Sequence, residues 1–568
     1  MRRWRLVVAV ALAAFIAAPL LLPTTKLFTD PDGRPIGADV PRIVSLSQTT
    51  SLLVAGTLAL CLPTGVVAAV FLYRTDLPFR HTLRALVVLT LFIPLPLFTS
   101  GWQAAVGSGG WLPLRWWNAE RPPDAVFSSD GNVWTPWGQG IGTAIWIHAV
   151  AGLPWIVWLV GRGLRQVDRE LEEDALTTTS AWRVVLLVSL PRASAWIAGA
   201  ALWVALQTAT EITVTDVMQV RTYAEEIYTQ FVLSDRGALA RTVIVSLPLT
   251  LLVIGIVLVA VRRWEQTLPS SLMRLTQPKT FHLRSWRWPA GLAIAAAAVF
   301  LIAIPVGSLI WRAGLAGSPL SWSAGETVRN LRQAVGSSSS TLWNSVVVAF
   351  GSGLVAATLA LVACWSASES RGFRTAVFIL VAAAWAMPGP VVGLGLLALI
   401  DGLLNATGQG IIADVLWYGP SPVPVMWADV IRFFPCAVAV LWPALRMLPT
   451  ELREAARVEG AGPLREFVAV VVPLTAGMWL LAALTAGVLS LGEVSGSKIV
   501  STPGGETWSH LVFAQMHYGV TSDLAARCLL LLLVVVAGTC AIGAVRVLPR
   551  VIAAARVSFS AQRLPSRS

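Results

Sequence analysis

The sequence has few charged residues. Only 13% of its residues are Asp, Glu, Lys or Arg, whereas 56% are hydrophobic. Soluble domains have about 25% charged residues, so this composition excludes an ordinary water-soluble enzyme. The 568 residues are better counted in apolar segments of about 20 residues, the length that spans a membrane as a helix.

Lysine is rarer still, with three residues at positions 26, 279 and 498. None follows a glycine, so the chain lacks the GxxxxGK[ST] loop that cradles nucleotide phosphates. It also lacks the HExxH and GxSxG patterns of metalloproteases and serine hydrolases. We therefore predict that the chain is not an enzyme by itself.

Cysteine and histidine number five each. The cysteines lie in apolar runs without CxxC or Cys/His spacing, and the histidines show no ligand spacing, so we predict no disulfide framework, metal site or other cofactor. The net charge of +12 comes from basic residues dispersed between apolar runs. This placement fits membrane topology and argues against nucleic acid as a partner.

Apolar windows predict twelve transmembrane helices, and hence an all-α polytopic membrane protein embedded in a lipid bilayer. The predicted spans are 6–23, 50–73, 85–104, 140–160, 194–217, 239–261, 289–310, 344–366, 375–400, 426–446, 475–495 and 524–546. The first is too long for a signal-peptide core and no small-residue cleavage site follows it, so we predict a retained span.

Charge asymmetry predicts the orientation of these spans. If the N-terminus is cytoplasmic, most of the 42 Lys and Arg residues fall on the inside, which places both termini in the cytoplasm. The outside segment 105–138 is rich in Trp (Trp111, Trp116, Trp117, Trp134 and Trp137). These aromatic residues suit a headgroup interface, and binding of a sugar or base is the alternative.

The chain contains an internal repeat. Residues 172–191 read EEDALTTTSAWRVVLLVSLP and residues 454–473 read EAARVEGAGPLREFVAVVVP, so the Glu and Pro at their ends align at an offset of 282. The same offset places Glu211 on Glu493, one span further along each half. Two matches at one offset indicate a duplicated unit.

The repeat predicts the domain organisation. A first transmembrane half comprises residues 1–262, a second comprises 289–568, and a cytoplasmic linker with two prolines and several basic residues, 263–288, joins them. Each half has six predicted spans. A parallel repeat of this kind has its pseudo-twofold axis along the membrane normal.

The repeated stretch 454–473 predicts a short helix on the cytoplasmic side. Thr450 can cap its start, alanines favour helix, and Gly460 and Gly462-Pro463 break it before a second helical run, 464–472. Small side chains at Ala455 and Ala456 allow another protein to approach the backbone closely. We interpret the helix as one that docks in a groove; a solvated connector is the alternative.

A specific motif lies in this helix: Glu-Ala-Ala, three residues, Gly, nine residues, an aliphatic, one residue, an aliphatic and Pro. It is formed by Glu454, Ala455, Ala456, Gly460, Val470, Val472 and Pro473, and it resembles the EAA signature of the permease subunits of bacterial ABC importers. The first half keeps Glu172, Trp182 and Pro191, but Glu173-Asp174 replace Ala-Ala and Thr178 replaces Gly.

Two such loops in one chain resemble the fused permeases that include ferric iron transporters. Further likeness to that branch comes from Asn344-Ser345, from LGEVSGSKIVSTPGGETW at 491–508, and from Phe513, Met516, His517, Tyr518 and Gly519. The resemblance implies a type I importer fold in the bacterial inner membrane. It also implies loops that dock on a homodimer of separate ATPase subunits, a periplasmic or lipoprotein substrate-binding protein, and ferric iron as the substrate.

Glu211 and Glu493 are the candidate residues of the translocation path. A carboxylate within lipid is costly and usually faces a protein interior or a watery cavity, so we predict that the two face each other near the pseudo-twofold axis. Local capping at the outer ends of their spans is the alternative. Asp429 and Arg432, three residues apart, are predicted to pair, and Asp401 and Asp414 bracket an outside loop where a binding protein can dock.

Other substrates and classes remain open at this point. Thiamine, a polyamine or an oxyanion such as sulfate are alternatives within the same class. A twelve-span secondary transporter also has two six-span halves, but it has no use for two docking loops. A membrane enzyme is disfavoured because no catalytic constellation is present.

Overall fold

The computed structural model describes residues 2–25, 40–106, 140–233, 243, 250–263, 265, 279–317, 321–408 and 410–561. The Trp-rich segment, most of the linker and part of the predicted span 239–261 lie outside these residues. The described chain is almost entirely helical, apart from one two-stranded antiparallel pair, β1 (Leu315–Ala316) and β2 (Ser321–Trp322). The protein is therefore an all-α polytopic membrane protein, as predicted.

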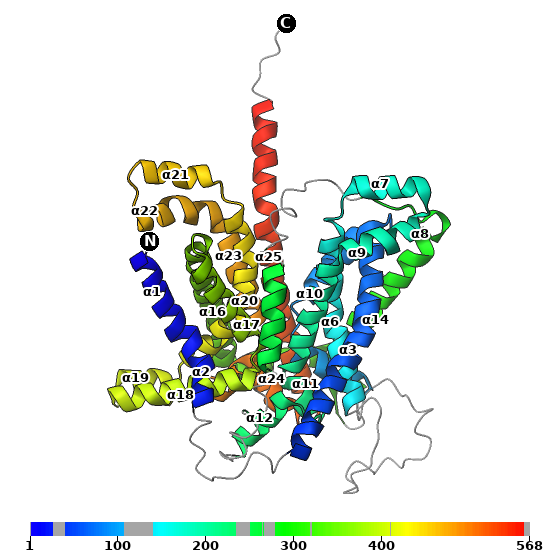
Figure 1. Ribbon diagram of the computed structural model, residues 1–568. Coiled ribbons are helices and arrows are strands. Elements are labelled where there is room, and N and C mark those ends of the chain that lie inside the picture. The colour runs from blue at the N-terminus through cyan, green and yellow to red at the C-terminus, as the bar shows by residue number, and fades with distance from the viewer. Residues whose placement is uncertain are drawn as a thin grey trace.

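The helices of the two halves are shown in Figure 1. Those before the linker are α1 (Arg2–Leu12), η1 (Ala13–Ala17), α2 (Ala18–Thr25), α3 (Val40–Arg74), α4 (Arg80–Thr90), α5 (Leu95–Val106), α6 (Ile141–Leu164), α7 (Arg169–Thr178), α8 (Ala181–Val184), η6 (Val185–Ser189), α9 (Leu190–Arg192), α10 (Ser194–Ala209), α11 (Thr213–Val217) and α12 (Tyr223–Val232). Those after it are η7 (Arg284–Trp286), α14 (Arg287–Ala313), α15 (Ala324–Ser337), α16 (Ser339–Ser368), α17 (Arg371–Ala386), α18 (Gly389–Thr407), α19 (Ile411–Ala413), η8 (Asp414–Tyr418), α20 (Val423–Arg446), α21 (Thr450–Val458), α22 (Pro463–Glu466), η9 (Phe467–Val471), α23 (Val472–Ser490), η10 (Ser497–Val500), α24 (Trp508–Met516) and α25 (Ser522–Ala561).

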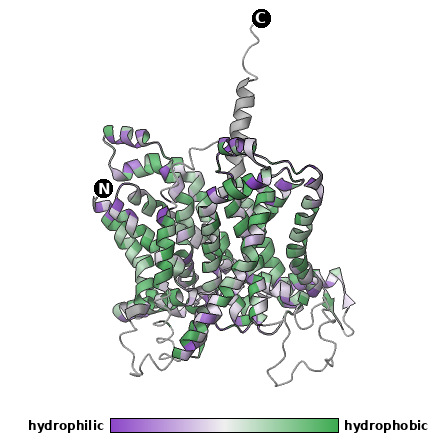
Figure 2. Cartoon of the chain, turned by 45° about the vertical axis from the view of Figure 1, so that its right-hand side comes forward, coloured by the Kyte–Doolittle hydropathy of each residue, from purple (hydrophilic) through white to green (hydrophobic). Residues whose placement is uncertain are grey.

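Nine helices in the described residues are long and apolar enough to cross a membrane, or up to eleven if each of two bent pairs counts as one span. The nine are Arg3–Pro23, Val40–Arg74, Ile141–Leu164, Arg284–Ala313, Ser339–Ser368, Gly389–Thr407, Val423–Arg446, Pro463–Ser490 and Ser522–Val545. Figure 2 shows hydrophobic residues through the middle of the molecule and hydrophilic ones gathered toward its two ends. This distribution is the one that a bilayer imposes.

Two predicted spans are broken by proline. The span expected at 85–104 consists of α4 and α5, bent by 105° around Pro94, and the span expected at 375–400 ends at Ala386 and restarts as α18 after Pro388. Proline lacks an N–H and disfavours helical backbone in the residue before it. Met387 accordingly has extended backbone, with φ −69° and ψ 128°. Hydropathy windows do not detect such breaks.

The first helix of each half packs on the other half. The α1–α2 segment contacts α16 and α18, and its Ile16 and Leu20 belong to a core formed by α16, α17 and α20. In turn, α14 packs against α5 of the first half, where Gly101 meets Pro305, as well as against α25 of its own half. The predicted halves are therefore interlocked in space.

The repeat is visible in the helices. Ile141–Leu164 (α6) and Val423–Arg446 (α20) are 282 residues apart at both ends, and so are the π-helical turns Val185–Ser189 (η6) and Phe467–Val471 (η9). Each turn lies just before one of the repeated prolines, Pro191 and Pro473. A proline cannot donate the usual helical hydrogen bond, so a locally widened turn accommodates it.

A close helix crossing offers a test of the packing. An added Cβ at Gly353 of α16 meets the backbone of α23 at Ala483 and Gly487, whereas one at Gly477 of α23 meets nothing within 4 Å. We expect Gly353→Ala to destabilise the protein by roughly 1–3 kcal/mol through overpacking. Gly477→Ala should stabilise it by about 0.5–1 kcal/mol through its helix propensity. Thermal unfolding in detergent measures both, and equal shifts for the two variants contradict this packing.

Candidate functional site: two loops and the junction between the halves

The second repeated loop folds as predicted into two helical pieces. The helix α21 ends before Gly460, which has φ +81°, a left-handed conformation that glycine adopts without strain. The next helix starts at Pro463 and continues through η9 into α23 as one candidate span. The predicted Thr450 cap is wrong: Pro449 is the N-cap residue, and no side-chain bond caps the helix.

The outer side of α21 carries the motif residues. Glu454, Ala455 and Gly460 are exposed and Ala456 is half-buried. Exposed apolar side chains lie nearby in the chain: Val458 is 89% exposed, and Leu452 and Leu464 are also exposed. The segment that follows α21, from Gly462 into η9, borders a groove of about 490 Å³. Its lining consists of Gly462, Pro463, Leu464, Arg465, Val468 and Ala469.

The inner side of α21 is clamped by arginines. Arg453 Nε and Arg457 Nε each donate to Glu466, both at 2.8 Å, and both side chains also pair with Glu369, the residue after α16. The hydrogen bond to Glu466 raises the pKa of Arg457, and the Glu466 carboxylate itself is buried. We call this set the second clamp. It fixes the loop to the ends of two membrane helices.

The first loop has a clamp with the charges reversed. Glu172 of α7 is fully buried against Arg74 at the end of α3, and Ser189 Oγ donates to it at 2.6 Å. We call these three residues the first clamp. Glu172, predicted as a docking contact, therefore holds the loop from within, and its role in docking stays a prediction.

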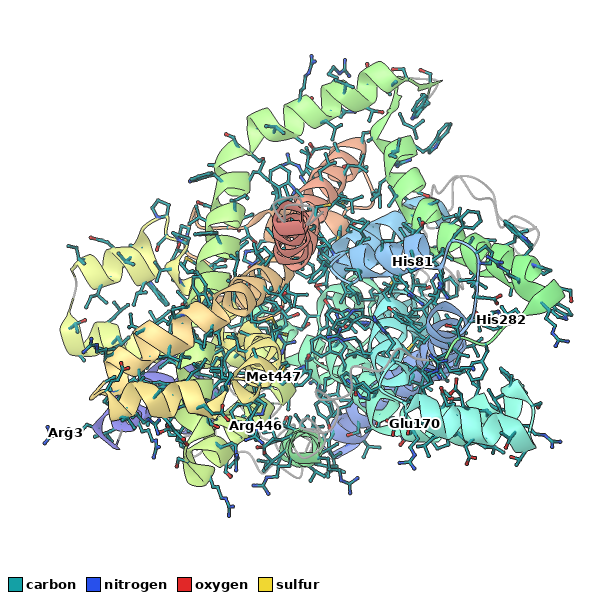
Figure 3. All side chains as sticks on the ribbon, turned by 90° about the horizontal axis from the view of Figure 1, so that it is seen from above. Arg3, His81, Glu170, His282, Arg446 and Met447 are labelled. Carbon is teal, nitrogen blue, oxygen red and sulfur yellow. The ribbon has the colours of Figure 1, made fainter. Side chains whose placement is uncertain are left out.

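The outer sides of the two loops correspond. Trp182 of the first loop and Leu464 of the second are 282 residues apart, and each is 58% exposed. Pro191 and Pro473 are exposed as well. Figure 3 looks onto the face that carries both loops, with Glu170 of α7 and Arg446 and Met447 at the end of α20 labelled. Both halves thus present an apolar side chain beside a short helix on one face.

The end of the linker attaches to the first loop, which the sequence did not predict. Lys279 Nζ lies 2.9 Å from Glu173 Oε1, and hydrogen bonds from Lys279 and Arg169 lower the pKa of Glu173. Phe281 exchanges backbone hydrogen bonds with the end of α3, accepting from Asp76 N and donating to Arg74 O. Glu173, where the motif has Ala, is therefore the linker's anchor point.

The halves also meet at the end of the spans opposite the two loops. We call this contact region the junction: it comprises residues 210–216 of the first half and the second-half residues around them. Thr210 O accepts from Gly389 N at 3.3 Å, and Ile212 N donates to Ser495 Oγ at 3.3 Å. Asp216 Oδ2 lies 3.0 Å from His517 Nε2. The 16 residues of α10, about 24 Å of helix, separate the junction from the first loop.

Glu211 and Glu493 both lie at the junction and both form local caps. Glu211 accepts hydrogen bonds from the N–H groups of Thr213 and Val214 at the start of α11, and Glu493 accepts one from Gly496 N at 2.9 Å. The two carboxylates also act electrostatically on each other. Local capping and mutual proximity coexist, and the role of both residues in a path stays a prediction.

Arg432 pairs with Glu493 and not, as predicted, with Asp429. Its Nε lies 3.9 Å from Glu493 Oε2, and no ion pair joins it to Asp429 among the residues that the structure describes. Asp429 and Arg432 share a helix face, but the guanidinium of Arg432 extends across the junction.

Asp401 and Asp414, which bracket the predicted outside loop, are exposed. Of the residues that resemble the iron branch, Asn344 and Ser345 bond to Gly504 O and Trp508 N.

These features define a multi-pass α-helical membrane protein with a duplicated loop on one face. No family model matches the sequence. The chain is 30% identical over 176 residues to the putrescine transport system permease protein PotI of Escherichia coli strain K12, and to the protein of the same name from Escherichia coli O6:H1. The match covers 31% of this chain and 59% of each relative.

The first clamp can be tested by its stability. Removing one partner of a buried ion pair leaves the other charge uncompensated, so Arg74→Met should cost about 3–5 kcal/mol. The double variant Arg74→Met with Glu172→Met should recover much of this loss. Thermal unfolding of both variants measures the difference. A double variant no more stable than Arg74→Met contradicts the clamp.

The contact between His517 and Asp216 should depend on pH. The hydrogen bond to Asp216 raises the pKa of His517, which lies outside the candidate spans, above its ordinary 6.5. Its contribution is therefore fully present below about pH 6.5 and is lost as pH rises through the raised pKa. Because both groups are partly exposed, we expect roughly 0.5 kcal/mol.

The control for this prediction is His517→Gln. Melting temperatures in detergent should show the greatest advantage of wild type over the variant at about pH 6, and this advantage should shrink as the pH rises. A difference that does not change with pH shows that the imidazolium does not stabilise the junction.

Proposed function

We propose that this chain is the membrane-spanning permease of an ABC importer, with both halves in one polypeptide. The observation that carries the proposal is the pair of loops, each of which exposes apolar side chains on one face and is clamped to membrane helices by buried charges. A loop built in this way can receive force from another protein and pass it to the spans. The 30% identity to PotI over part of the chain supports this class.

The partners follow from the same geometry. The face that carries α7 and α21 is cytoplasmic in this proposal, and two copies of a separate ATPase subunit bind there in the inner membrane of a bacterium. The helix α1 begins and α25 ends on that face (Figure 1), in line with cytoplasmic termini. A substrate-binding protein delivers the substrate to the opposite face.

The substrate in this proposal is a cation. The carboxylates Glu211, Glu493 and Asp429 lie at or beside the junction, where the halves must separate to let a substrate pass. The printed name of PotI assigns putrescine to that relative, which supports the polyamine alternative for this chain. Ferric iron stays a prediction of the sequence resemblance.

Val458→Asp tests the proposed docking. The side chain is 89% exposed on α21, so the change should not disturb folding, but it places a charge in the proposed interface. Desolvation of a carboxylate should lower ATPase association on the order of ten-fold, equivalent to about 1.4 kcal/mol. The measurement is ATP hydrolysis per mole of tagged chain purified with its partners.

The matched control is Tyr518→Asp. Tyr518 is 86% exposed and follows α24, a helix that lies away from α7 and α21 in Figure 1. It should leave the associated ATPase activity unchanged. Equal activity for wild type and both variants contradicts docking at α21.

A further inference from the structure

Arg432 joins the two halves at the junction. It comes from α20 of the second half, and its Nη2 donates to Thr210 Oγ1 of the first half at 2.7 Å. Its Nη1 donates to Met387 O at 2.9 Å, and its Nε lies 3.9 Å from Glu493 Oε2. One guanidinium thus has three oxygen partners: a carbonyl, a hydroxyl and a carboxylate.

Two further carboxyl groups, those of Asp429 and Glu211, lie near Glu493. Asp429, one turn earlier on α20, is 1% exposed and interacts electrostatically with Glu493, and its Oδ1 has no hydrogen-bond partner. Glu211 completes a set of three carboxylates. His148, 2% exposed, points its unpartnered Nε2 toward Glu211 Oε2 at 4.0 Å. Buried polar atoms without partners are rare, and each calls for an explanation.

The oxygen partners of Arg432 can also accept hydrogen bonds from other nitrogen cations. Carbonyl, hydroxyl and carboxylate oxygens accept hydrogen bonds from an ammonium group as readily as from a guanidinium. The site also bridges the halves, so any separation of the junction pulls Arg432 away from Thr210. Glu493 then loses its cationic partner, which is unfavourable unless another cation replaces it.

We propose that Arg432 is a tethered stand-in for the substrate and that its oxygen partners, with Asp429, form a binding site for an organic cation bearing primary ammonium groups. In the structure the arginine occupies this site and holds the junction closed. A passing alkylammonium displaces it and keeps the carboxylates compensated while the halves are apart. This inference rests on the proposed importer function and deepens it by naming the substrate class.

Equilibrium binding of radiolabelled putrescine to the full chain in lipid nanodiscs tests this site. Arg432→Gln should bind putrescine about ten-fold more tightly if the arginine leaves the wild-type site vacant about one-tenth of the time. Adding Glu493→Gln to this variant should abolish the gain. Thr210→Val removes one partner of the guanidinium while keeping every charge, and it should give a smaller gain in the same direction.

The control is Arg446→Gln, at the exposed loop end of the same helix, which makes the same change in net charge and should leave affinity unchanged. The proposal is overturned if neither Arg432→Gln nor Thr210→Val gains affinity over this control, or if the gain survives Glu493→Gln. The proposal is also overturned if none of the variants binds putrescine. Because this assay contains no ATPase, its result is independent of the Val458→Asp test, in which unchanged ATPase activity contradicts the proposed function.

Discussion

The structure depends on how its two exposed loops are attached to the membrane helices. A helix that lies in water and is joined only by flexible turns transmits no force to the bilayer. Here buried or half-buried ion pairs attach each loop to the membrane helices. They join Arg74 to Glu172 in one half, and Arg453 and Arg457 to Glu466 in the other. Such pairs are costly to break once buried. The reversed polarity of the two clamps indicates that the duplicated unit kept the attachment while its residues changed.

In each half, a continuous stretch of helical chain connects the clamp to the junction. In the second half, Pro463–Ser490 is one candidate span that starts in the loop and ends three residues before Glu493. In the first half, the corresponding route bends by 66° between α9 and α10 before it reaches Thr210. The linker further fixes the first loop through Lys279. The two loops are therefore equivalent in position but differ in how they are attached to the rest of the chain.

Much of this was predictable from the sequence. The offset of 282 identified the repeat, and the helices α6 and α20 and the two π-turns keep it. The short helix of the second loop and its end at Gly460 were also predicted. Local patterns suffice for such features because apolar runs and glycine act through the backbone nearby.

The rest depends on tertiary contacts that no local pattern encodes. Glu172 aligns with Glu454 in sequence, yet it is buried against Arg74, which lies 98 residues earlier. Asp429 and Arg432 have helical spacing, but the guanidinium pairs with Glu493 across the junction. The packing of each half's first helix on the other half likewise depends on contacts between segments that are distant in the sequence.

In the proposed function, force from ATP-hydrolysing partners passes through the clamped loops and opens the junction. Putrescine uptake into vesicles that contain the chain with its co-purified ATPase and binding protein measures this directly. We expect uptake that requires ATP and is lost when the ATPase subunits are omitted. Uptake by the chain alone, driven by an ion gradient without ATP, would contradict it.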